Sequence, residues 1–470
     1  MPDEITDEFA NADLGDPRRA KRLPKLAASL AQAPAESISA ACGGWSEVIA
    51  ACRFLNKGEF EARELIRPHR RMILERSVGH DCALAIQDTT ELDFTPMKTV
   101  TDLGPLNDET RRGFCMHGHY VVSEQGLPLG VLGADIIVRD DEDFRQAAKR
   151  KNLPIEEKES HRWIEGYRMA CELAHDLPDT EVISVSDREG DIFELYLEWL
   201  NSEGSHRAEW VVRANQDRVL VDVEKGAPDR LFDAMRAAPL LGEIEFEVAA
   251  KTGSKKVKGN RIKTRREAHT VRQEIRAMEI TPRPPQRKGL KLPKVTFWAV
   301  LAEETDPPPG EEPVRWLLLT SKEITTLEEA RRIIRVNLRR WDIEVFFRIL
   351  KTGCRVERVQ LKTCEALIRA LMIYLVIAWR IHYLTHLGRQ CPDLPCGCVF
   401  EEAEWKSACA VVKRSPEAGE PSLREFIGII GKLGGHLGRK SDGDPGPQVI
   451  WRGLSRVRDF ACVWRAIHEE

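Results

Sequence analysis

The segment Cys82–Asp88, CALAIQD, and the segment Glu181–Asp187, EVISVSD, share one pattern: a short apolar run that ends in an aspartate. Such runs are typical of buried strands. A hairpin signal around SEQGLP (123–128) and a helical segment (157–177) lie between them, and another helix is expected from about Asp191. Both aspartates are then expected at the carboxyl ends of strands, where sites form in open α/β sheets.

The order strand, hairpin, helix, strand, helix matches a ribonuclease H-like core, a mixed sheet with flanking helices. After the strand Glu209–Asn215 the pattern changes. Between Lys251 and Lys294 there are 15 Lys or Arg and only 3 Glu, in alternating segments. We interpret this region as an all-β insertion with a basic face; a basic solvated hairpin or a disordered loop is the alternative.

The expected division of the 470 residues follows from these patterns. Helical N- and C-terminal regions flank the core, and RWLLLTS (315–321) returns to it as a strand. Thr326 and Glu329 predict a capping box, and Asp342 is a candidate cap for the next helix. The expected parts are a helical N-terminal domain (1–75), the core (76–215 and 313–365), a β-rich insertion (216–312) and a helical C-terminal region (366–470).

Composition narrows the classes of protein. The formal net charge of −4 does not indicate nucleic-acid binding, so such contacts must come from local patches. The acidic start lacks the apolar stretch of a signal peptide. The longest uncharged apolar run, Ala370–Trp379, has ten residues, too few to span a bilayer, and predicts a buried helix. The twelve cysteines fit a reducing cytosol. The spacing of Cys391, Cys396 and Cys398 favours incidental thiols over a zinc site.

The first basic segment is LGDPRRAKRL (14–23). Asp16 is a natural N-cap and Pro17 a natural first helical residue. Four cations then occupy the first turns, against the helix dipole: Arg18, Arg19, Lys21 and Arg22. A phosphate contact and simple solvent exposure both explain them.

The stretch Arg339–Gly353, RRWDIEVFFRILKTG, places Glu344 on one helix face with Arg340, Arg348 and Lys351. One interpretation is a solvated face with ion pairs. The other is a carboxylate that binds a cation, flanked by residues that hold an anionic substrate. With Asp88 and Asp187 there would be three carboxylates, which are the hard oxygen ligands that Mg²⁺ prefers. Two such ions serve phosphodiester chemistry.

QDTTELDF (87–94), SDREGDIFELY (186–196) and RRWDIEVFFRILKTG, in this order, resemble the three acidic motifs of DDE transposases, and in particular the insertion-sequence-four family. LGDPRRAKRL resembles that family's N-terminal DNA-binding segment. KESHRW (158–163), WVVRAN (210–215) and RWLLLTS resemble its core, and LGGHLGRKSDG (433–443) and PGPQVIWRGLSRV (445–457) resemble its C-terminal end. The similarity spans nearly the whole chain.

The resemblance implies roles for particular residues. Asp88, Asp187 and Glu344 would be the catalytic ligands of two divalent cations, Mg²⁺ or Mn²⁺ as a substitute. Arg340, Glu344 and Lys351 fill three of the four positions of the family's third motif, while Asn337 replaces its Tyr. The remaining DNA contacts that the family implies are Arg348, two core arginines, Arg213 and Arg218, and Trp316, which matches a tryptophan that stacks on a flipped base.

The resemblance also implies cut-and-paste transposition by a metal-dependent endonuclease. Its steps are cleavage at the transposon end, hairpin formation and strand transfer into target DNA. The expected partners are double-stranded DNA and a second copy of the chain, in a homodimeric synaptic complex, without a membrane. The expected location is the bacterial cytoplasm, at the nucleoid. Two alternatives remain open: a non-catalytic DNA-binding relative, and a metal-dependent nuclease or resolvase on the same core.

Overall fold

The computed structural model describes residues 5–141, 153–202, 207–223, 225–257, 260–287, 291–415, 418–439 and 442–468, with backbone only for 251–257 and 260–266. The chain has the mixed α/β fold that the sequence predicts, and it divides into two compact units. The first comprises Met1–Arg162, Asp176–Thr180 and Trp341–Glu470, and the second comprises Trp163–His175 and Glu181–Arg340.

The first unit begins with short helices: η1 (Asp7–Phe9), α1 (Pro17–Gln32), α2 (Ile38–Ala41), α3 (Trp45–Lys57), η2 (Ala62–Leu65) and α4 (Arg67–Ser77). Asp16 accepts a hydrogen bond from the Arg18 backbone N–H at 2.8 Å, which confirms it as the N-cap of α1. Towards the end of the expected helical domain (1–75), η2 and α4 are separate elements. Pro68 lies in the first turn of α4, where its missing N–H costs nothing; inside one continuous helix it would break a hydrogen bond.

The sheet of the first unit contains β1 (Cys82–Asp93), β2 (Gly104–Pro105), β3 (Arg112–Ser123) and β4 (Pro128–Ile137). β3 pairs antiparallel with β1 on one side and with β4 and β2 on the other, so the predicted hairpin is confirmed. The expectation that Asp88 ends its strand is wrong. The ladder with β3 continues from Asp88, opposite Gly118, to Asp93, opposite Gly113, and the β-branched threonines after Asp88 suit a strand.

Two 3₁₀ turns, η3 (Ile155–Glu157) and η4 (Glu159–His161), precede the helix expected at 157–177. The first unit resumes with α11 (Trp341–Arg348), the π-helix η6 (Ile349–Gly353), η7 (Val356–Arg358) and α12 (Cys364–Gln390). Asp342 lies inside the first turn of α11, so its expected role as a cap is wrong; the previous helix ends at Arg339 and only Arg340 separates the two.

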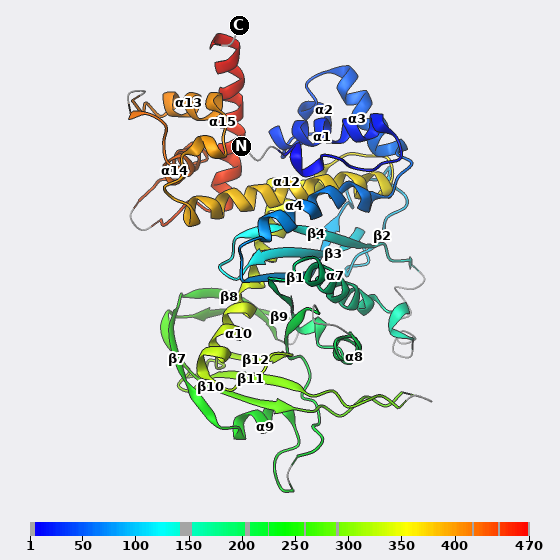
Figure 1. Cartoon of the computed structure of the whole chain (residues 1–470), viewed down its shortest axis with the longest axis vertical. Helices are drawn as coiled ribbons and strands as arrows, with labels where there is room; N and C mark the ends of the chain where they lie inside the picture. Colours follow the sequence, from blue (N-terminus) through cyan, green and yellow to red (C-terminus); the bar gives the residue numbers. More distant parts are fainter. Residues whose placement is uncertain are drawn as a thin grey trace. The chain divides into compact units, whose positions relative to one another are not determined.

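Helix α12 is buried along most of its length, which confirms the interpretation of Ala370–Trp379 as a core segment. α4 and α12 pack on β4 (Figure 1). No helix among the described residues has the length and apolar character needed to cross a membrane. The C-terminal elements are η8 (Cys396–Cys398), α13 (Glu402–Val411), α14 (Leu423–Leu433) and α15 (Pro447–His468), and α13 and α14 both pack on α15.

A buried polar network joins the N-terminal helices to this core. Glu8 of η1 accepts hydrogen bonds from His69 Nδ1 at 2.5 Å and from Arg76 Nη1 at 2.6 Å. The other nitrogen of His69 accepts the Val131 backbone N–H at 3.0 Å, so a neutral ring satisfies both contacts. The Arg76 guanidinium also lies 4.1 Å from the ring of Trp379 in α12. Three segments far apart in sequence are therefore held at one carboxylate.

The second unit holds α7 (Arg162–Asp176), β5 (Glu181–Ser186), η5 (Arg188–Gly190), α8 (Phe193–Asn201), β6 (Glu209–Arg213), β12 (Arg315–Thr320) and α10 (Leu327–Arg339). β5 and β6 are parallel, as in a strand pair linked by a crossover helix, and β12 pairs antiparallel with β6. The capping box of Thr326 and Glu329 at the start of α10 is confirmed.

The insertion contains α9 (Leu231–Ala237), β7 (Leu240–Val248), β8 (Lys251–Val257), β9 (Asn260–Arg266), β10 (His269–Ile280) and β11 (Phe297–Glu304). It is β-rich but not all-β, because Leu231, Ala234 and Met235 at helical spacing form a buried face of α9. β7, β10 and β11 extend the sheet from β12. The most basic part of the predicted basic face, residues 251–266, lies outside the described side chains.

Candidate active site and DNA-contacting residues

Asp88 and Glu344 lie on elements that pack against each other within the first unit. Asp88 on β1 is directly opposite Gly118 on β3, so both residues point to the same face of the sheet. A Cβ placed on Gly118 would lie 3.1 Å from Phe347 and 3.8 Å from Ile343, which puts α11 against that face. Glu344 follows Ile343 and precedes Phe347 by one turn. The helix that carries Glu344 therefore packs over the strand that carries Asp88.

A chain of buried hydrogen bonds fixes the backbone beside Asp88. The Thr89 backbone N–H donates to Asp88 Oδ1 at 2.7 Å, and the Thr89 hydroxyl lies 2.8 Å from His117 Nδ1. His117 Nε2 is 3.1 Å from Gln87 Oε1, and Arg162 Nε donates to the Thr89 hydroxyl at 3.0 Å. Burial holds the pKa of His117 well below its usual value, so the ring is neutral and can accept from Thr89 while it donates to Gln87.

Asp187 follows β5 directly, as predicted, and lies in a cationic part of the second unit. Its Oδ1 accepts the Glu189 backbone N–H at 2.7 Å and caps η5. Arg213 ends the parallel neighbour β6, at the same sheet edge. Burial lowers the pKa of Arg213, and the charges of Arg188 and Arg340 lower it further, while Asp187 opposes them. Arg213 thus lies in a field to which two other arginines and Asp187 contribute, and this field favours an anion beside it.

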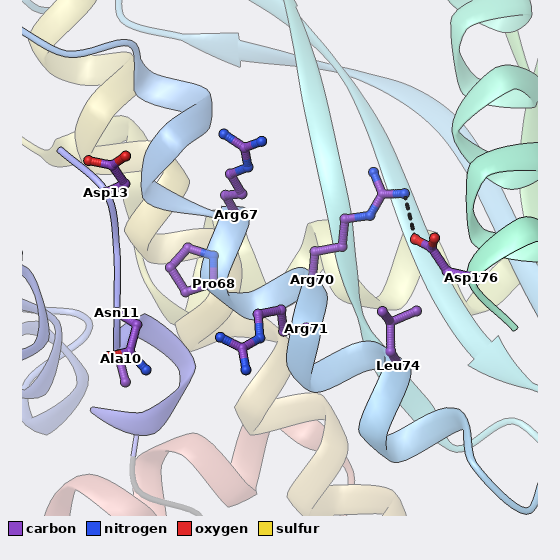
Figure 2. Close-up of a pocket in the computed structure, with 9 residues that line it drawn as sticks. All are labelled: Ala10, Asn11, Asp13, Arg67, Pro68, Arg70, Arg71, Leu74 and Asp176. Carbon is purple, nitrogen blue, oxygen red and sulfur yellow. Dashed lines mark hydrogen bonds and ion pairs between the residues drawn. The ribbon is translucent and has the colours of Figure 1, made fainter. Parts of the chain in front are cut away.

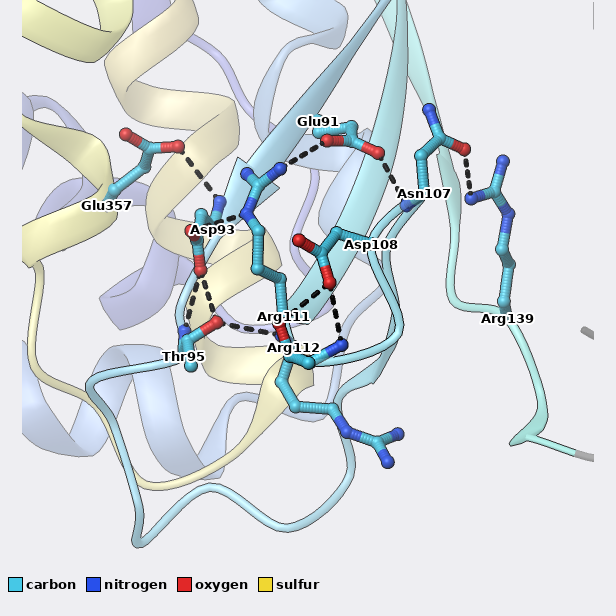
Figure 3. Close-up of polar contacts among 10 residues, drawn as sticks. Glu91, Asp93, Thr95, Asn107, Asp108, Arg111, Arg112, Arg139 and Glu357 are labelled. Atoms are coloured by element: carbon cyan, nitrogen blue, oxygen red, sulfur yellow. Dashed lines mark hydrogen bonds and ion pairs between the residues drawn. The ribbon is translucent and has the colours of Figure 1, made fainter. Parts of the chain in front are cut away.

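Lys351 lies in the π-helix that follows α11, a distortion that is common at functional sites. Burial lowers the pKa of this half-buried amine, while Glu357, Glu91 and Asp93 act in the opposite direction. Figure 3 shows how these carboxylates are held: Arg111 pairs with Glu91 and Asp93, both at 2.9 Å, and the Asp93 backbone N–H donates to Glu357 at 2.9 Å. Sequence reasoning missed this network because Glu91 and Asp93, although they lie in the first acidic motif, have partners at Arg111 and Glu357 that are outside the motifs and distant in sequence.

Arg348 and the third-motif residue Asn337 differ in exposure. Arg348 is exposed at the end of α11, where a phosphate could reach it. Asn337 is only 7% exposed, and its Oδ1 has no hydrogen-bond partner among the described residues. The Asn337 side chain is thus on the buried face of α10. A buried side chain does not suit the phosphate contact that the resemblance implies for the family's Tyr.

Arg218 is placed as a structural residue. Its side chain is 12% exposed and its Nη2 lies 2.6 Å from Asp191 Oδ1. Asp191 also accepts the backbone N–H groups of Asn215 and Gln216, at 2.7 and 3.1 Å, and the Tyr196 hydroxyl. The last acid of SDREGD, Asp191, is therefore a buried anchor that sequence reasoning did not single out; its close spacing to Asp187 was the available signal.

Trp316 is half-buried on β12 and stacks on Phe246 of β7, with ring centroids 5.7 Å apart and planes inclined by 13°. The next three residues, Leu317 to Leu319, are buried. The indole is thus outside the closely packed core but has an aromatic neighbour. This position suits both packing within the protein and stacking on a flipped base.

The four N-terminal cations divide into two pairs. Arg18 is 91% exposed apart from its 3.3 Å pair with Asp16, and Lys21 is exposed. Arg19 pairs with Glu59 at 3.0 Å, and Arg22 pairs with Glu47 at 2.5 Å. The latter two brace α1 against α3 and the segment after it, so only Arg18 and Lys21 present free sides to a ligand.

The described residues contain no group of three or more His, Cys, Asp or Glu side chains that could hold a metal ion. Burial raises the pKa of Cys396 to about 12, which disfavours the thiolate that zinc requires. The chemistry of Asp88, Asp187 and Glu344 does fit Mg²⁺ or Mn²⁺, which take oxygen ligands. Asp187 belongs to the second unit, whereas Asp88 and Glu344 belong to the first. A metal site shared by all three residues is therefore part of the proposed function.

Three family models match successive parts of the chain. The model described as transposase DNA-binding matches residues 3–59, the transposase DDE domain matches residues 78–380, and the transposase Tn5 dimerisation domain matches residues 376–467. The DDE match includes Asp88, Asp187 and Glu344 and covers more than half of the chain.

A solved structure with similarity to this chain is the cryo-EM structure of a piggyBac transposase synaptic complex with hairpin DNA. The identity is 10%, the TM-score is 0.31, and the match covers 69% of this chain and 52% of that chain. This protein therefore aligns with about half the length of that transposase. By its three family matches, the chain belongs to the DDE transposases and resembles the Tn5 transposase among them.

Proposed function

We propose that this protein is a cut-and-paste DNA transposase that binds transposon ends, cuts them and joins them to target DNA. The observation that carries the proposal is the packing of α11 over β1, which brings the Glu344 helix to the face that presents Asp88. Asp187 would complete the site from the end of β5. Together they would hold two divalent cations, which activate the attacking oxygen and neutralise the leaving oxygen in phosphodiester chemistry.

The basic residues bind and orient the scissile strand. The charges of Arg188 and Arg340 act on Arg213 and lower its pKa, so a bound phosphate would offset part of this repulsion. In the first unit, Arg348 and Lys351 follow Glu344 along the chain and would supply further phosphate contacts. Phosphoryl transfer needs little covalent help from the protein, and such positioning and charge neutralisation are its main contributions.

The reaction sequence uses one 3′-hydroxyl twice. Water attacks a phosphorus at the transposon end and the P–O3′ bond breaks, which releases a 3′-hydroxyl and leaves a 5′-phosphate. That hydroxyl attacks the opposite strand, forms a hairpin and displaces flanking DNA. A second water reopens the hairpin, and the same hydroxyl then attacks the target. In each step one P–O bond forms to the nucleophile, either water or a 3′-hydroxyl, and one P–O bond to the leaving oxygen breaks. No oxidant or reductant is needed.

The division of labour follows the predicted domains. Residues 1–75 would bind the end sequence, 76–215 and 313–365 form the catalytic core, 216–312 form the β-rich insertion, and 366–470 mediate a homodimer that pairs two ends. Val463 and Ile467, 59% and 71% exposed on α15, lie within the matched dimerisation region and are candidates for that contact.

The test uses a labelled duplex that carries the terminal inverted repeat flanking the gene. Asp88→Ala, Asp187→Ala and Glu344→Ala should each abolish cleavage in Mg²⁺ or Mn²⁺ while end binding stays within about threefold of wild type, because the phosphate-binding residues remain. Residual cleavage within tenfold of wild type would remove that residue from the site.

A strand-transfer assay with precleaved ends and a supercoiled target distinguishes a transposase from a metal-dependent nuclease. Strand transfer by the wild-type protein is expected. Cleavage without any joining to the target would identify a nuclease instead.

A further inference from the structure

A strongly cationic cavity in the first unit has no role in the function proposed above. It has a volume of about 590 Å³ and lies where the segment after α1 meets the π-helix η6 and α15. Its charged lining consists of Arg355, Arg452 and Arg456 against one acid, Glu36. Thr352, Gln448 and Ser455 add neutral hydrogen-bonding groups.

Two of the three guanidinium groups are available to a ligand. Arg456 donates to the Leu433 carbonyl at 2.6 Å and is partly used by the fold. Arg355 and Arg452 are exposed, and neither makes an ion pair with any acid among the residues that the structure describes. Gln448 lies in the first turn of α15, so the positive end of that helix adds to the field.

The backbone at Arg355 gives an independent sign of function. Arg355 has φ = 50° and ψ = 40°, the left-handed region that non-glycine residues rarely occupy. Such strain persists where the surroundings over-determine it, and it is common in ligand-binding segments. Here the strained turn directs a cation into the cavity four residues after Lys351.

A tight contact ties the cavity to the third motif. A Cβ on Gly353 would lie 3.0 Å from the Trp451 ring, so only glycine lets α15 pack this closely on the π-helix. Thr352, on the cavity wall, directly follows Lys351. A strand held by Arg348 and Lys351 would need to extend only a short distance along the backbone to reach Thr352 and Arg355.

One face of α15 carries an arginine pair near its N-terminal end and an apolar pair near its C-terminal end. Arg452, Arg456, Val463 and Ile467 fall within about 60° of one another around the helix, with Asp459 between the two pairs. The cationic pair lines the cavity, and the exposed apolar pair lies at the far end. An apolar end suits contact with a second copy, whereas a wet, arginine-rich hollow suits a phosphodiester.

We propose that the cavity formed by Arg355, Arg452, Arg456, Gln448 and Thr352 is a binding site for DNA backbone phosphates, separate from the metal-ligand residues. It rests on the proposed function, because it takes DNA as the ligand. The site holds the strand beyond the third motif and contributes affinity without reading sequence.

A second arginine-lined hollow shows the difference. It has a volume of about 480 Å³ and is lined by Arg67, Arg70 and Arg71 together with Asp13 and Asp176 (Figure 2). Arg70 pairs with Asp176 at 3.3 Å, and Arg67 pairs with Glu64 at 3.0 Å. Its cations are largely neutralised within the fold, so it is less suited to bind an anion than the cavity beside α15.

The experiment measures binding of the full chain to the end duplex as a function of salt. The test variant combines Arg355→Gly, which removes charge and backbone strain together, with Arg452→Ala. The slope of log K against log salt should fall by about 1.8, which is 0.9 for each of two lost phosphate contacts. Arg465→Ala, at the far end of α15, should leave it unchanged.

Ethylation of DNA phosphates locates the contact. One or two phosphates should interfere with binding of the wild-type protein and lose that effect in the double variant. An unchanged slope in a double variant that is folded by circular dichroism would overturn the site. A changed oligomeric state without DNA, at an unchanged slope, would assign the cavity to contact between copies and also overturn it. If the wild-type protein itself shows no salt-dependent binding to end DNA, the proposed function fails as well.

Discussion

Gly118 sets the distance between the strand of Asp88 and the helix of Glu344, so a side chain at this position should disturb catalysis from a site without chemistry of its own. A Cβ there would lie 3.1 and 3.3 Å from two atoms of the Phe347 ring, whereas ordinary contacts begin near 3.4 Å. Gly118→Ala must therefore move α11 by a few tenths of an ångström. Overpacking of this kind costs roughly 1–2 kcal/mol of folding stability.

The effect on rate should exceed what the stability loss alone would produce. A misplacement of 1 Å costs about 100-fold in catalysis, so a shift of a few tenths of an ångström predicts a loss of about three- to tenfold for Gly118→Ala. Gly118→Val, with two further methyl groups, should lose about 100-fold. End binding should fall much less than the rate, because only Arg348 among the proposed phosphate contacts lies on α11, whereas Arg18, Lys21 and Arg213 lie on other elements.

The assay is the initial rate of nicking on a labelled end duplex at saturating divalent cation, with affinity measured on the same duplex. Phe347→Leu removes the ring that the new methyl meets, so Gly118→Ala combined with Phe347→Leu should recover part of the lost rate. Gly428→Ala, where a Cβ meets nothing within 4 Å, is the matched control and should cut normally. A folded Gly118→Val variant that nicks at the wild-type rate would refute the argument that this packing positions Asp88 and Glu344.

Three further outcomes are expected. Arg18→Ala with Lys21→Ala should lower the salt slope of end binding by up to about 1.8, and an unchanged slope would return both residues to a solvated face. Trp316→Ala should slow hairpin formation more than the first nick, and an abasic site at the flipped base should restore part of the loss; equal slowing of both steps without rescue would leave Trp316 as packing only. Burial opposes the charge of Glu8, yet His69 and Arg76 lower its pKa to about 2, so its stabilisation is complete above pH 4.5 and is lost as the pH falls toward 2. Glu8→Gln should therefore remove roughly 3 kcal/mol at pH 7 and much less at pH 2 in denaturant titrations, whereas an equal loss at both pH values would contradict the lowered pKa.

The sequence by itself determined the features that depend on local pattern. The apolar run before Asp187 specifies a strand that ends there, and the Thr326 capping box specifies the start of α10. The apolar character of α12 on all sides requires burial. The order of the three acidic motifs indicated the family that the matches confirm. In each of the structural cases, the conformational preferences of a few neighbouring residues are enough to decide whether a strand or a helix forms and where it begins or ends.

Only the tertiary structure decided the features that depend on contacts between segments distant in sequence. β1 runs through Asp88 because β3 offers a ladder as far as Gly113, which the residues around Asp88 do not encode. Glu91 and Asp93 act on the charge of Lys351 only because the folded chain brings together segments about 260 residues apart, as the hydrogen bond from the Asp93 backbone N–H to Glu357 shows. Glu344 packs over the strand of Asp88 because Gly118 lacks the side chain that would keep α11 away. Such contacts depend on the shape of both surfaces at once, and no local stretch of sequence contains that information.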